Sequence, residues 1–269
     1  MHDHDQDFLD IYGVTQDPET KEYIIVMEHA NNGSLLSYLV QNINKLTWKM
    51  KLQHLKDIAD YLTIIHDAGI VHCDIHGGNI LLHNDDGNES GTEEELCIST
   101  LLICDLGLSQ SVNSHKSNST IQGVLPFIAP EVFHTCKFTQ ESDIYSFGII
   151  MYLIATGEPP FRDRPFDRDL VHDVMGGLRP SMPDSAPEEY KRLAAMCCDA
   201  DPEKRPDILK VIDIIFKTTV DYFGKDSGWN TIYHNDIKPL SRFEKESKYS
   251  SRFLPTGDLP KPRNGHHHR

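Results

Sequence analysis

Residues 70–82 constrain the fold most, because they are apolar at both ends and polar in the middle. The segment reads Ile-Val-His-Cys-Asp-Ile-His-Gly-Gly-Asn-Ile-Leu-Leu, so its ends can be buried while its centre faces something polar. Asp74 and Asn79 stand five residues apart in that centre, and Asp105 follows a short apolar run at residues 101–103. We therefore predict a loop, anchored at both ends, that holds an acid and an amide near a second acid.

These three side chains suggest phosphoryl transfer. That reaction needs a carboxylate to orient the acceptor hydroxyl and oxygen ligands for Mg²⁺. Magnesium prefers hard oxygen donors and is usually held by one or two carboxylates together with substrate phosphates. A rigid loop can supply Asp74 and Asn79, while the end of the next strand supplies Asp105.

The surrounding pattern predicts a mainly helical chain with a short hairpin near its start. Strand formers at residues 8–14 and 22–28 are separated by a turn at Asp17-Pro18-Glu19. Thr47 is suited to cap a long helix that ends just before Gly69. Further helices are expected at residues 34–39, 139–154, 167–175, 187–198 and 206–218, and a brief strand at 101–103.

Two segments lack the pattern of a packed element. Residues 83–95 are acidic with little to bury, which predicts a solvated insertion. Residues 222–269 are polar and broken by proline and glycine, which predicts a flexible tail, including the histidines at 266–268.

Composition excludes several classes of protein. The net charge of −15 argues against a nucleic-acid binder, which needs a concentrated basic surface. The six cysteines show neither a CxxC pair nor metal-ligand spacing, and no apolar run reaches the ~18 residues that span a bilayer. The polar N-terminus does not resemble a signal peptide. We expect a cytoplasmic protein in a reducing compartment, without nucleic-acid or membrane partners.

In its motifs the chain resembles the eukaryotic protein kinase family, and most closely the tyrosine-kinase-like branch, which mainly phosphorylates serine and threonine. Six matches occur in the family's order. They are the catalytic loop His72-Cys-Asp-Ile-His-Gly-Gly-Asn79, the magnesium loop Asp105-Leu-Gly107, Ala129-Pro-Glu131, the helix start Asp143-Ile-Tyr-Ser-Phe-Gly148, its exit Gly157-Glu-Pro-Pro-Phe161, and Arg205 in Asp201-Pro-Glu-Lys-Arg-Pro206.

The resemblance implies an α+β, protein-kinase-like fold. Residues 1–30 would be a remnant of the N-terminal lobe, comprising its last two strands and the hinge. Residues 31–221 would be the mainly helical C-terminal lobe with the acidic insertion at 83–95, and residues 222–269 the tail.

The resemblance also implies roles for individual residues. Asp74, His76 and Asn79 would be catalytic, and Asn79 and Asp105 would hold Mg²⁺. ATP would lie against the gatekeeper Met27, the backbone of Glu28 and Ala30, and Leu81 beneath the base. The structural residues would be His72, Leu106, Gly107, Glu131, Asp143 and Arg205. Among these, His72 and Leu106 would join Ile11 in a spine, Asp143 would accept catalytic-loop N–H groups, and Glu131 would pair with Arg205.

Several features depart from the family pattern. Residues before the hinge contain no glycine-rich loop, no strand lysine and no helix glutamate, so we expect a truncated domain with little activity as given. Cys73 replaces the arginine that reads activation-segment phosphorylation. His76 stands where serine/threonine kinases carry a lysine, and its imidazole is a weaker charge partner at pH 7. Val124 replaces a threonine that hydrogen-bonds the catalytic aspartate.

Three functions are therefore open. The first is a protein kinase that uses ATP and Mg²⁺ on protein serine or threonine. The second is a catalytically inactive, pseudokinase-like module that binds a regulatory protein. The third is a small-molecule phosphotransferase, whose relatives resemble the chain at His76 and Gly78 but lack the Ala-Pro-Glu segment and the Arg205 pairing.

Overall fold

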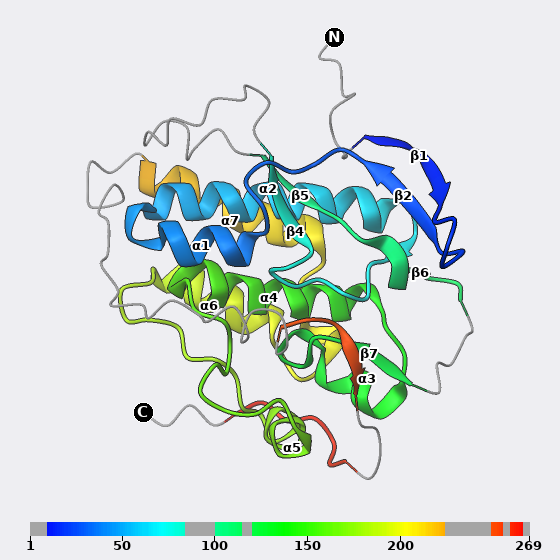
Figure 1. Cartoon of the computed structure of the whole chain (residues 1–269). Coiled ribbons are helices and arrows are strands. Elements are labelled where there is room, and N and C mark those ends of the chain that lie inside the picture. Colours follow the sequence, from blue (N-terminus) through cyan, green and yellow to red (C-terminus); the bar gives the residue numbers. More distant parts are fainter. Residues whose placement is uncertain (1–9, 84–99, 115–119, 224–248, 255–258, 266–269) are drawn as a thin grey trace.

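The computed structural model describes residues 10–83, 100–114, 120–223, 249–254 and 259–265 (Figure 1). The helices are α1 (Leu35–Asn42), α2 (Trp48–Asp67), α3 (Pro130–Thr135), α4 (Gln140–Thr156), α5 (Arg168–Met175), α6 (Glu188–Cys197) and α7 (Ile208–Phe223). The strands are β1 (Ile11–Gln16), β2 (Tyr23–Met27), β3 (Ile70–Val71), β4 (Ile80–His83), β5 (Thr100–Ile103), β6 (Gln110–Ser111), β7 (Ile121–Gly123) and β8 (Arg252–Leu254). This is the mainly helical α+β architecture that the sequence predicts.

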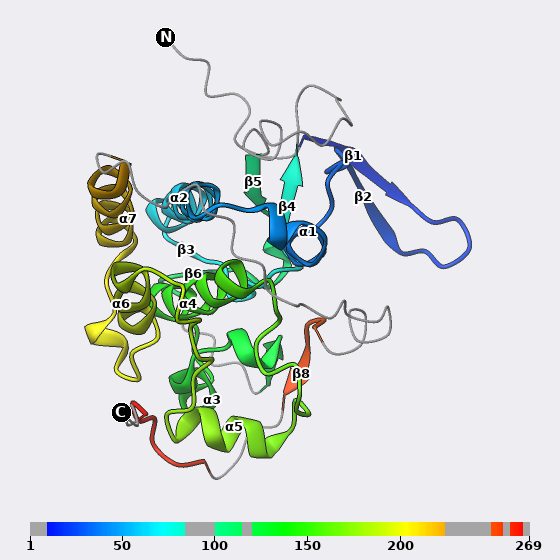
Figure 2. The same ribbon diagram turned by 90° about the vertical axis from the view of Figure 1, so that its left-hand side faces the viewer.

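Strands β1 and β2 form an antiparallel hairpin that projects from the helical body (Figure 2). Asp17 closes its turn, because one carboxylate oxygen accepts the backbone N–H groups of Thr20 and Glu19 at 2.8 Å each. These bonds favour the charged carboxylate and lower the pKa of Asp17. The predicted hairpin and turn are confirmed, but both strands are largely exposed on both faces.

Helix α4 is the centre of the helical body, since α1, α2 and α6 all pack against it. Its start is fixed by a reciprocal cap: Thr139 accepts the N–H of Ser142 at 3.3 Å, and the Ser142 hydroxyl accepts the N–H of Thr139 at 3.0 Å. Gly157 ends the helix with a φ of 70°, the left-handed conformation that glycine adopts without strain. The helix is buried nearly all round, as its apolar sequence predicts.

The long helix α2 lies across α4 and is covered on its other side by α7. Thr47 caps its start by accepting the N–H of Met50 at 3.3 Å, and Gly69 follows its end with a φ of 68°. Both features match the prediction. Within the described ranges, none of the helices combines the length and the apolar character needed to cross a membrane.

Three further pairs of antiparallel strands position the loops: β3 with β6, β4 with β5, and β7 with β8. In the β4–β5 pair Ile80 lies opposite Ile103, and the N–H of Cys104 donates to the carbonyl of Asn79 at 2.8 Å. Residues just before β4 and just after β5 therefore meet at one end of this pair. The predicted acidic insertion lies outside the described residues, apart from His83 at the end of β4.

Part of the predicted tail is packed on the helical body, so flexibility is the wrong prediction for residues 249–254 and 259–265. Tyr249 and Leu254 are buried, and β8 pairs with β7. Farther on, the N–H of Ala200 donates to the side chain of Asn264 at 2.7 Å. The pattern fails here because these segments are short, and Tyr249 and Leu254 are buried by other elements although Phe253 is exposed. Helix α7 also extends to Phe223, beyond the predicted end at residue 218.

His54 gives the fold a specific sensitivity to acid. It is buried in α2, where its ring meets Tyr38 edge-on at 5.7 Å and neither ring nitrogen has a hydrogen-bond partner in the described residues. Burial lowers the pKa of His54 to about 4. Between pH 6.5 and 4 the unfolded chain binds this proton and the folded chain does not, so stability falls as the pH falls.

We predict that His54→Leu weakens this pH dependence. Between pH 7 and 5 the variant should lose about 2 kcal/mol less free energy of unfolding than the wild type. The reason is that its unfolded chain has no imidazole at position 54 to bind a proton that the folded chain cannot bind. Urea unfolding at both pH values measures the difference. His54→Phe separates titration from packing, since a packing defect lowers stability equally at both pH values. An unchanged slope in both variants would contradict the assignment.

Candidate active site

Asp143 fixes the loop that carries Asp74. Its side chain on the first turn of α4 is 1% exposed and accepts the backbone N–H groups of His72 at 2.8 Å and Cys73 at 3.0 Å. One of its oxygens also lies 3.1 Å from Nε2 of His66 in α2. The predicted role of Asp143 as an acceptor for catalytic-loop N–H groups is confirmed.

Cys73 is held in an unusual backbone conformation by these bonds. Its φ is 72°, a region that non-glycine residues rarely adopt, and its side chain is buried. Burial, with the Asp143 carboxylate as a further cause, raises the pKa of the Cys73 thiol well above its usual range. The thiol is therefore neutral and supplies no cation at the position where the family carries arginine.

Asp74 is almost fully buried and meets two of the predicted catalytic residues. The side-chain nitrogen of Asn79 donates to the Asp74 carbonyl at 3.0 Å and to its Oδ2 at 3.3 Å. His76 Nε2 lies 3.7 Å from the same Oδ2. The other oxygen, Oδ1, faces β7, since a Cβ built on Gly123 would lie 3.4 Å from it. The structure thus brings Asp74, His76 and Asn79 together and leaves Oδ1 on the side of β7.

Backbone donors settle the proton positions on two histidines. The N–H of Gly78 donates to Nδ1 of His76 at 3.0 Å, so in the neutral ring Nε2 carries the proton and directs it at Asp74. The N–H of Asp74 likewise donates to Nδ1 of His72 at 3.3 Å, and Nε2 of His72 donates to the Cys104 carbonyl at 3.1 Å. Burial lowers the pKa of His72, which agrees with a neutral ring that braces the loop.

Asp105 lies at the same end of the β4–β5 pair as Asn79, joined to it through the Cys104–Asn79 hydrogen bond. It has a φ of 64°, and its Oδ1 accepts the N–H of Gly107 at 3.1 Å. A Cβ at Gly107 would lie only 2.9 Å from that oxygen, so glycine permits this tight turn. Asp105 is exposed, as a residue that meets a ligand from solvent must be.

Asn79 and Asp105 fit a magnesium ion by their chemistry. The amide nitrogen of Asn79 is committed to Asp74, so its Oδ1 is oriented away and remains available as a ligand. Asp105 adds a carboxylate. In the described ranges no group of three or more His, Cys, Asp and Glu side chains is placed to hold a metal ion. One carboxylate and one amide instead suit Mg²⁺, which takes its other ligands from phosphates and water.

The predicted adenine contacts lie where β2 leads into α1. Met27 ends β2 and is 42% exposed, whereas Ala30 is buried. Glu28 lies between them, and its side chain is 3.4 Å from Nε2 of His83 at the end of β4. Leu81 is partly buried in β4, and its backbone forms a bridge with Ser34 in this linking segment. The arrangement gathers these residues near one edge of β4, and their contact with adenine stays a prediction.

The predicted spine is wrong for two of its three members. His72 is fully buried, but Ile11 is 67% exposed and Leu106 is 45% exposed. Side chains stay buried only where other apolar groups cover them, and in the described residues nothing encloses the two faces of the β1–β2 hairpin.

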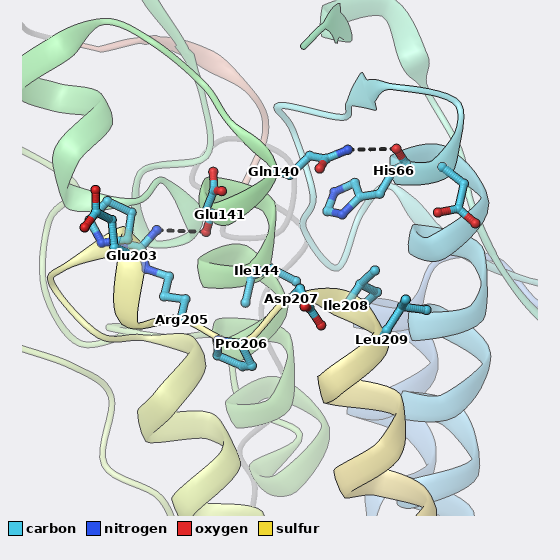
Figure 3. Close-up of a pocket in the computed structure, with 12 residues that line it drawn as sticks. His66, Gln140, Glu141, Ile144, Glu203, Arg205, Pro206, Asp207, Ile208 and Leu209 are labelled. Carbon is cyan, nitrogen blue, oxygen red and sulfur yellow. Dashed lines mark hydrogen bonds between the residues drawn. The ribbon is translucent and has the colours of Figure 1, made fainter.

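Arg205 and Glu131 form the predicted buried ion pair. Two guanidinium nitrogens of Arg205 donate to the two carboxylate oxygens of Glu131 at 2.7 and 2.6 Å. Arg205 also donates to the carbonyl of Glu141 at 2.8 Å (Figure 3). It donates to the carbonyl of Asp199 at 2.9 Å, and its side chain is 0% exposed. The pair therefore ties α3 to the starts of α4 and α7 and acts as architecture.

A cavity of about 280 Å³ opens beside this ion pair, between the end of α2 and the starts of α4 and α7 (Figure 3). Gln140 spans it by donating to the carbonyl of His66 at 2.8 Å. Asp74, Asn79 and Asp105 do not line this cavity, so it is separate from the candidate active site.

Sequence reasoning missed the closeness of Gly123 to Asp74 and the packing of Tyr249 near the catalytic loop. Neither has a local signal, because both depend on where distant segments meet. Val124, which replaces the expected threonine, is buried and offers Asp74 no hydroxyl.

Comparison with known proteins identifies the family of the chain. A family model described as protein tyrosine and serine/threonine kinase matches residues 1–215. The probable serine/threonine-protein kinase roco8 of Dictyostelium discoideum is 33% identical over 210 residues, which are 74% of this chain and 11% of that protein. The tyrosine-protein kinase SPK-1 of Girardia tigrina is 27% identical over 241 residues, covering 86% and 45% of the two chains. The tyrosine-protein kinase hopscotch of Drosophila melanogaster is 29% identical over 202 residues, covering 72% and 16%. The chain spans less than half the length of each of these relatives.

We predict that Arg205→Met lowers the free energy of unfolding by about 3–5 kcal/mol, because it leaves the Glu131 carboxylate buried without its partner. Replacing both partners, with Glu131→Leu added, should recover most of that loss. Chemical denaturation measures all three proteins. Arg162→Met is the control, since Arg162 pairs with Glu158 at 3.7 Å nearer the surface and should cost less than about 1 kcal/mol. Equal losses at Arg205 and Arg162 would contradict the assignment.

Proposed function

Because the chain belongs to the protein tyrosine and serine/threonine kinase family, we propose that it transfers the γ-phosphate of ATP to serine or threonine hydroxyls of proteins. One observation carries the proposal: the amide nitrogen of Asn79 is bonded to Asp74, which leaves its oxygen available as a ligand. The same contacts orient the carboxylate that would meet the acceptor.

The proposed roles follow from the geometry. Oδ2 of Asp74 is engaged by Asn79 and His76, so Oδ1 is the oxygen that orients the acceptor hydroxyl and takes its proton. The amide oxygen of Asn79 and the carboxylate of Asp105 would hold Mg²⁺, which, when bound, neutralises charge on the phosphates. Met27, Glu28, Ala30 and Leu81 would place the nucleotide.

Serine or threonine is the proposed acceptor because of the resemblance to the tyrosine-kinase-like branch. The relatives named above include both serine/threonine and tyrosine kinases by their names. His76 supports a role near the transferred phosphate, since its Nε2–H is directed into the site. It is a weaker charge partner than lysine at neutral pH, so we expect slower transfer than in kinases that carry lysine there.

A non-catalytic, pseudokinase-like role is the second candidate. It is favoured by the neutral, buried thiol of Cys73 and by the exposed side chains of Ile11 and Leu106. In that case the chain would act by binding a regulatory protein. A small-molecule phosphotransferase is less well supported, because its relatives lack the Ala-Pro-Glu segment and the Arg205 pairing, and here Glu131 and Arg205 are paired.

We propose a reducing, cytoplasmic location. The five cysteines in the described residues, Cys73, Cys104, Cys136, Cys197 and Cys198, are free thiols.

We predict that Asp74→Asn lowers phosphate transfer by about 100-fold or more, because the carboxamide cannot accept the hydroxyl proton. The measurement is incorporation from Mg-ATP labelled at the γ-phosphate into protein serine and threonine, located by mass spectrometry. Nucleotide binding, followed by calorimetry, should persist in the variant.

Asp163→Asn is the matched control, since the side chain of Asp163 is 98% exposed. It should transfer phosphate as the wild type does. If a chain extended by an N-terminal lobe with a glycine-rich loop and a strand lysine folds and binds Mg-ATP but transfers no phosphate, the proposal fails and the regulatory role is favoured. Equal transfer by the Asp74→Asn variant would show that another group carries the reaction.

A further inference from the structure

The strand β8 lies beside β7 (Figure 1). In the sequence, β7 immediately precedes the segment that leads to the Ala-Pro-Glu helix α3. The two strands are antiparallel, with Leu254 opposite Ile121 and Arg252 opposite Gly123. A segment more than 120 residues away in the sequence is therefore joined to β7 by main-chain pairing.

This pairing places β8 next to the candidate catalytic carboxylate. Gly123 is close enough to Asp74 that a Cβ on it would lie 3.4 Å from Oδ1. Arg252 is the partner of Gly123, and paired residues in antiparallel strands have Cα atoms about 4.5–5.5 Å apart. Arg252 is thus the residue of β8 that pairs with the residue next to Asp74. It has no hydroxyl, and its guanidinium donates to the carbonyl of Phe166 at 2.7 Å.

Tyr249 anchors the beginning of the segment. It is 6% exposed, and its ring meets Phe166 edge-on with centroids 5.1 Å apart. Tyr249 also closes a small gap lined by His76, Phe127 and Pro160. Its ring therefore packs between the catalytic loop, the loop that follows β7 and the connection that follows α4.

Neighbouring side chains at the end of β8 differ in burial, as they do in an extended peptide bound along a strand, while Arg252 at its start is exposed. Leu254 is 7% exposed, whereas Phe253 is 71% exposed. In this mode of recognition the main chain supplies affinity, and the side chains that enter pockets supply specificity. Tyr249 and Leu254 are the side chains that enter.

We propose that residues 249–254 are a pseudosubstrate, which occupies in cis the surface where the chain of a protein substrate docks along β7. This inference rests on the proposed kinase function. The surface takes an extended segment with an aromatic residue three positions before the acceptor and an aliphatic residue two positions after it. Arg252 stands at the acceptor position, so the bound segment blocks the site without being phosphorylated there.

The first test locks the segment in place. Gln122 and Phe253 face each other across the two strands, so the pair Gln122→Cys with Phe253→Cys can form a disulfide without removing a buried anchor. The probe is a fluorescein-labelled peptide with the sequence of residues 247–256 carrying Arg252→Ser. Its binding is followed by anisotropy without ATP. Oxidation should weaken binding at least about tenfold and reductant should restore it, while each single cysteine variant should not respond. Binding that ignores oxidation would overturn the inference.

The second test releases the segment. Tyr249→Ala with Leu254→Ala should let the same peptide bind about tenfold more tightly than it binds the wild type, because the internal competitor is lost. Phe253→Ala is the matched control on the same strand and should change nothing. Thermal unfolding checks that the released protein is folded. If the released variant and the Phe253→Ala control bind the peptide equally, the segment is not a competitor.

These measurements separate this inference from the proposed reaction. If the disulfide between positions 122 and 253 excludes the peptide, but neither the wild type nor any variant transfers phosphate, the docking surface stands and the catalytic proposal fails. If phosphate transfer to protein is normal and the lock leaves it unchanged, the kinase function stands and the pseudosubstrate is refuted.

Discussion

The site depends on the buried carboxylate of Asp143. Removing such a group from water costs several kcal/mol unless hydrogen bonds satisfy it, and here two loop N–H groups and His66 do so. The same bonds hold Cys73 in a left-handed conformation that costs about 1–2 kcal/mol for a residue with a side chain. Because Asp143 belongs to α4, the most deeply buried helix, the loop that carries Asp74 takes its position from the core itself.

The opposite side of the site is fixed just as firmly. Ser146, one turn along α4 from Asp143, donates to the Phe127 carbonyl at 2.6 Å. Arg205 holds Glu131 in α3 four residues later. The segment from β7 to α3 is therefore tied to the same helix as the catalytic loop, so the spacing between Asp74 and Gly123 is set by one rigid element. Pairing with β7 is therefore enough to fix the position of a strand relative to Asp74.

The sequence predicts what depends on local pattern and on spacing. The hairpin, the capped helices α2 and α4, and the Asp143 and Arg205 contacts all follow from caps, periodicity and the resemblance. It does not predict the exposure of Ile11 and Leu106, since an apolar residue looks the same in the sequence whether or not something covers it. It also misses β8, because a three-residue strand acquires its pairing from β7, and the nearby Tyr249 meets Phe166, both far away in the sequence.

The departure at Cys73 acquires a meaning when the proposed pseudosubstrate is considered. A kinase loop with an arginine at position 73 would respond to a charge placed on the activation segment. Here that position holds a neutral, buried thiol, so charge on this segment has no guanidinium there to recruit. Occupancy of β7 works without such a receptor, because main-chain pairing and two buried side chains hold the segment in place. Regulation by displacement of residues 249–254 therefore does not need an arginine at position 73, whereas regulation by charge on the activation segment does.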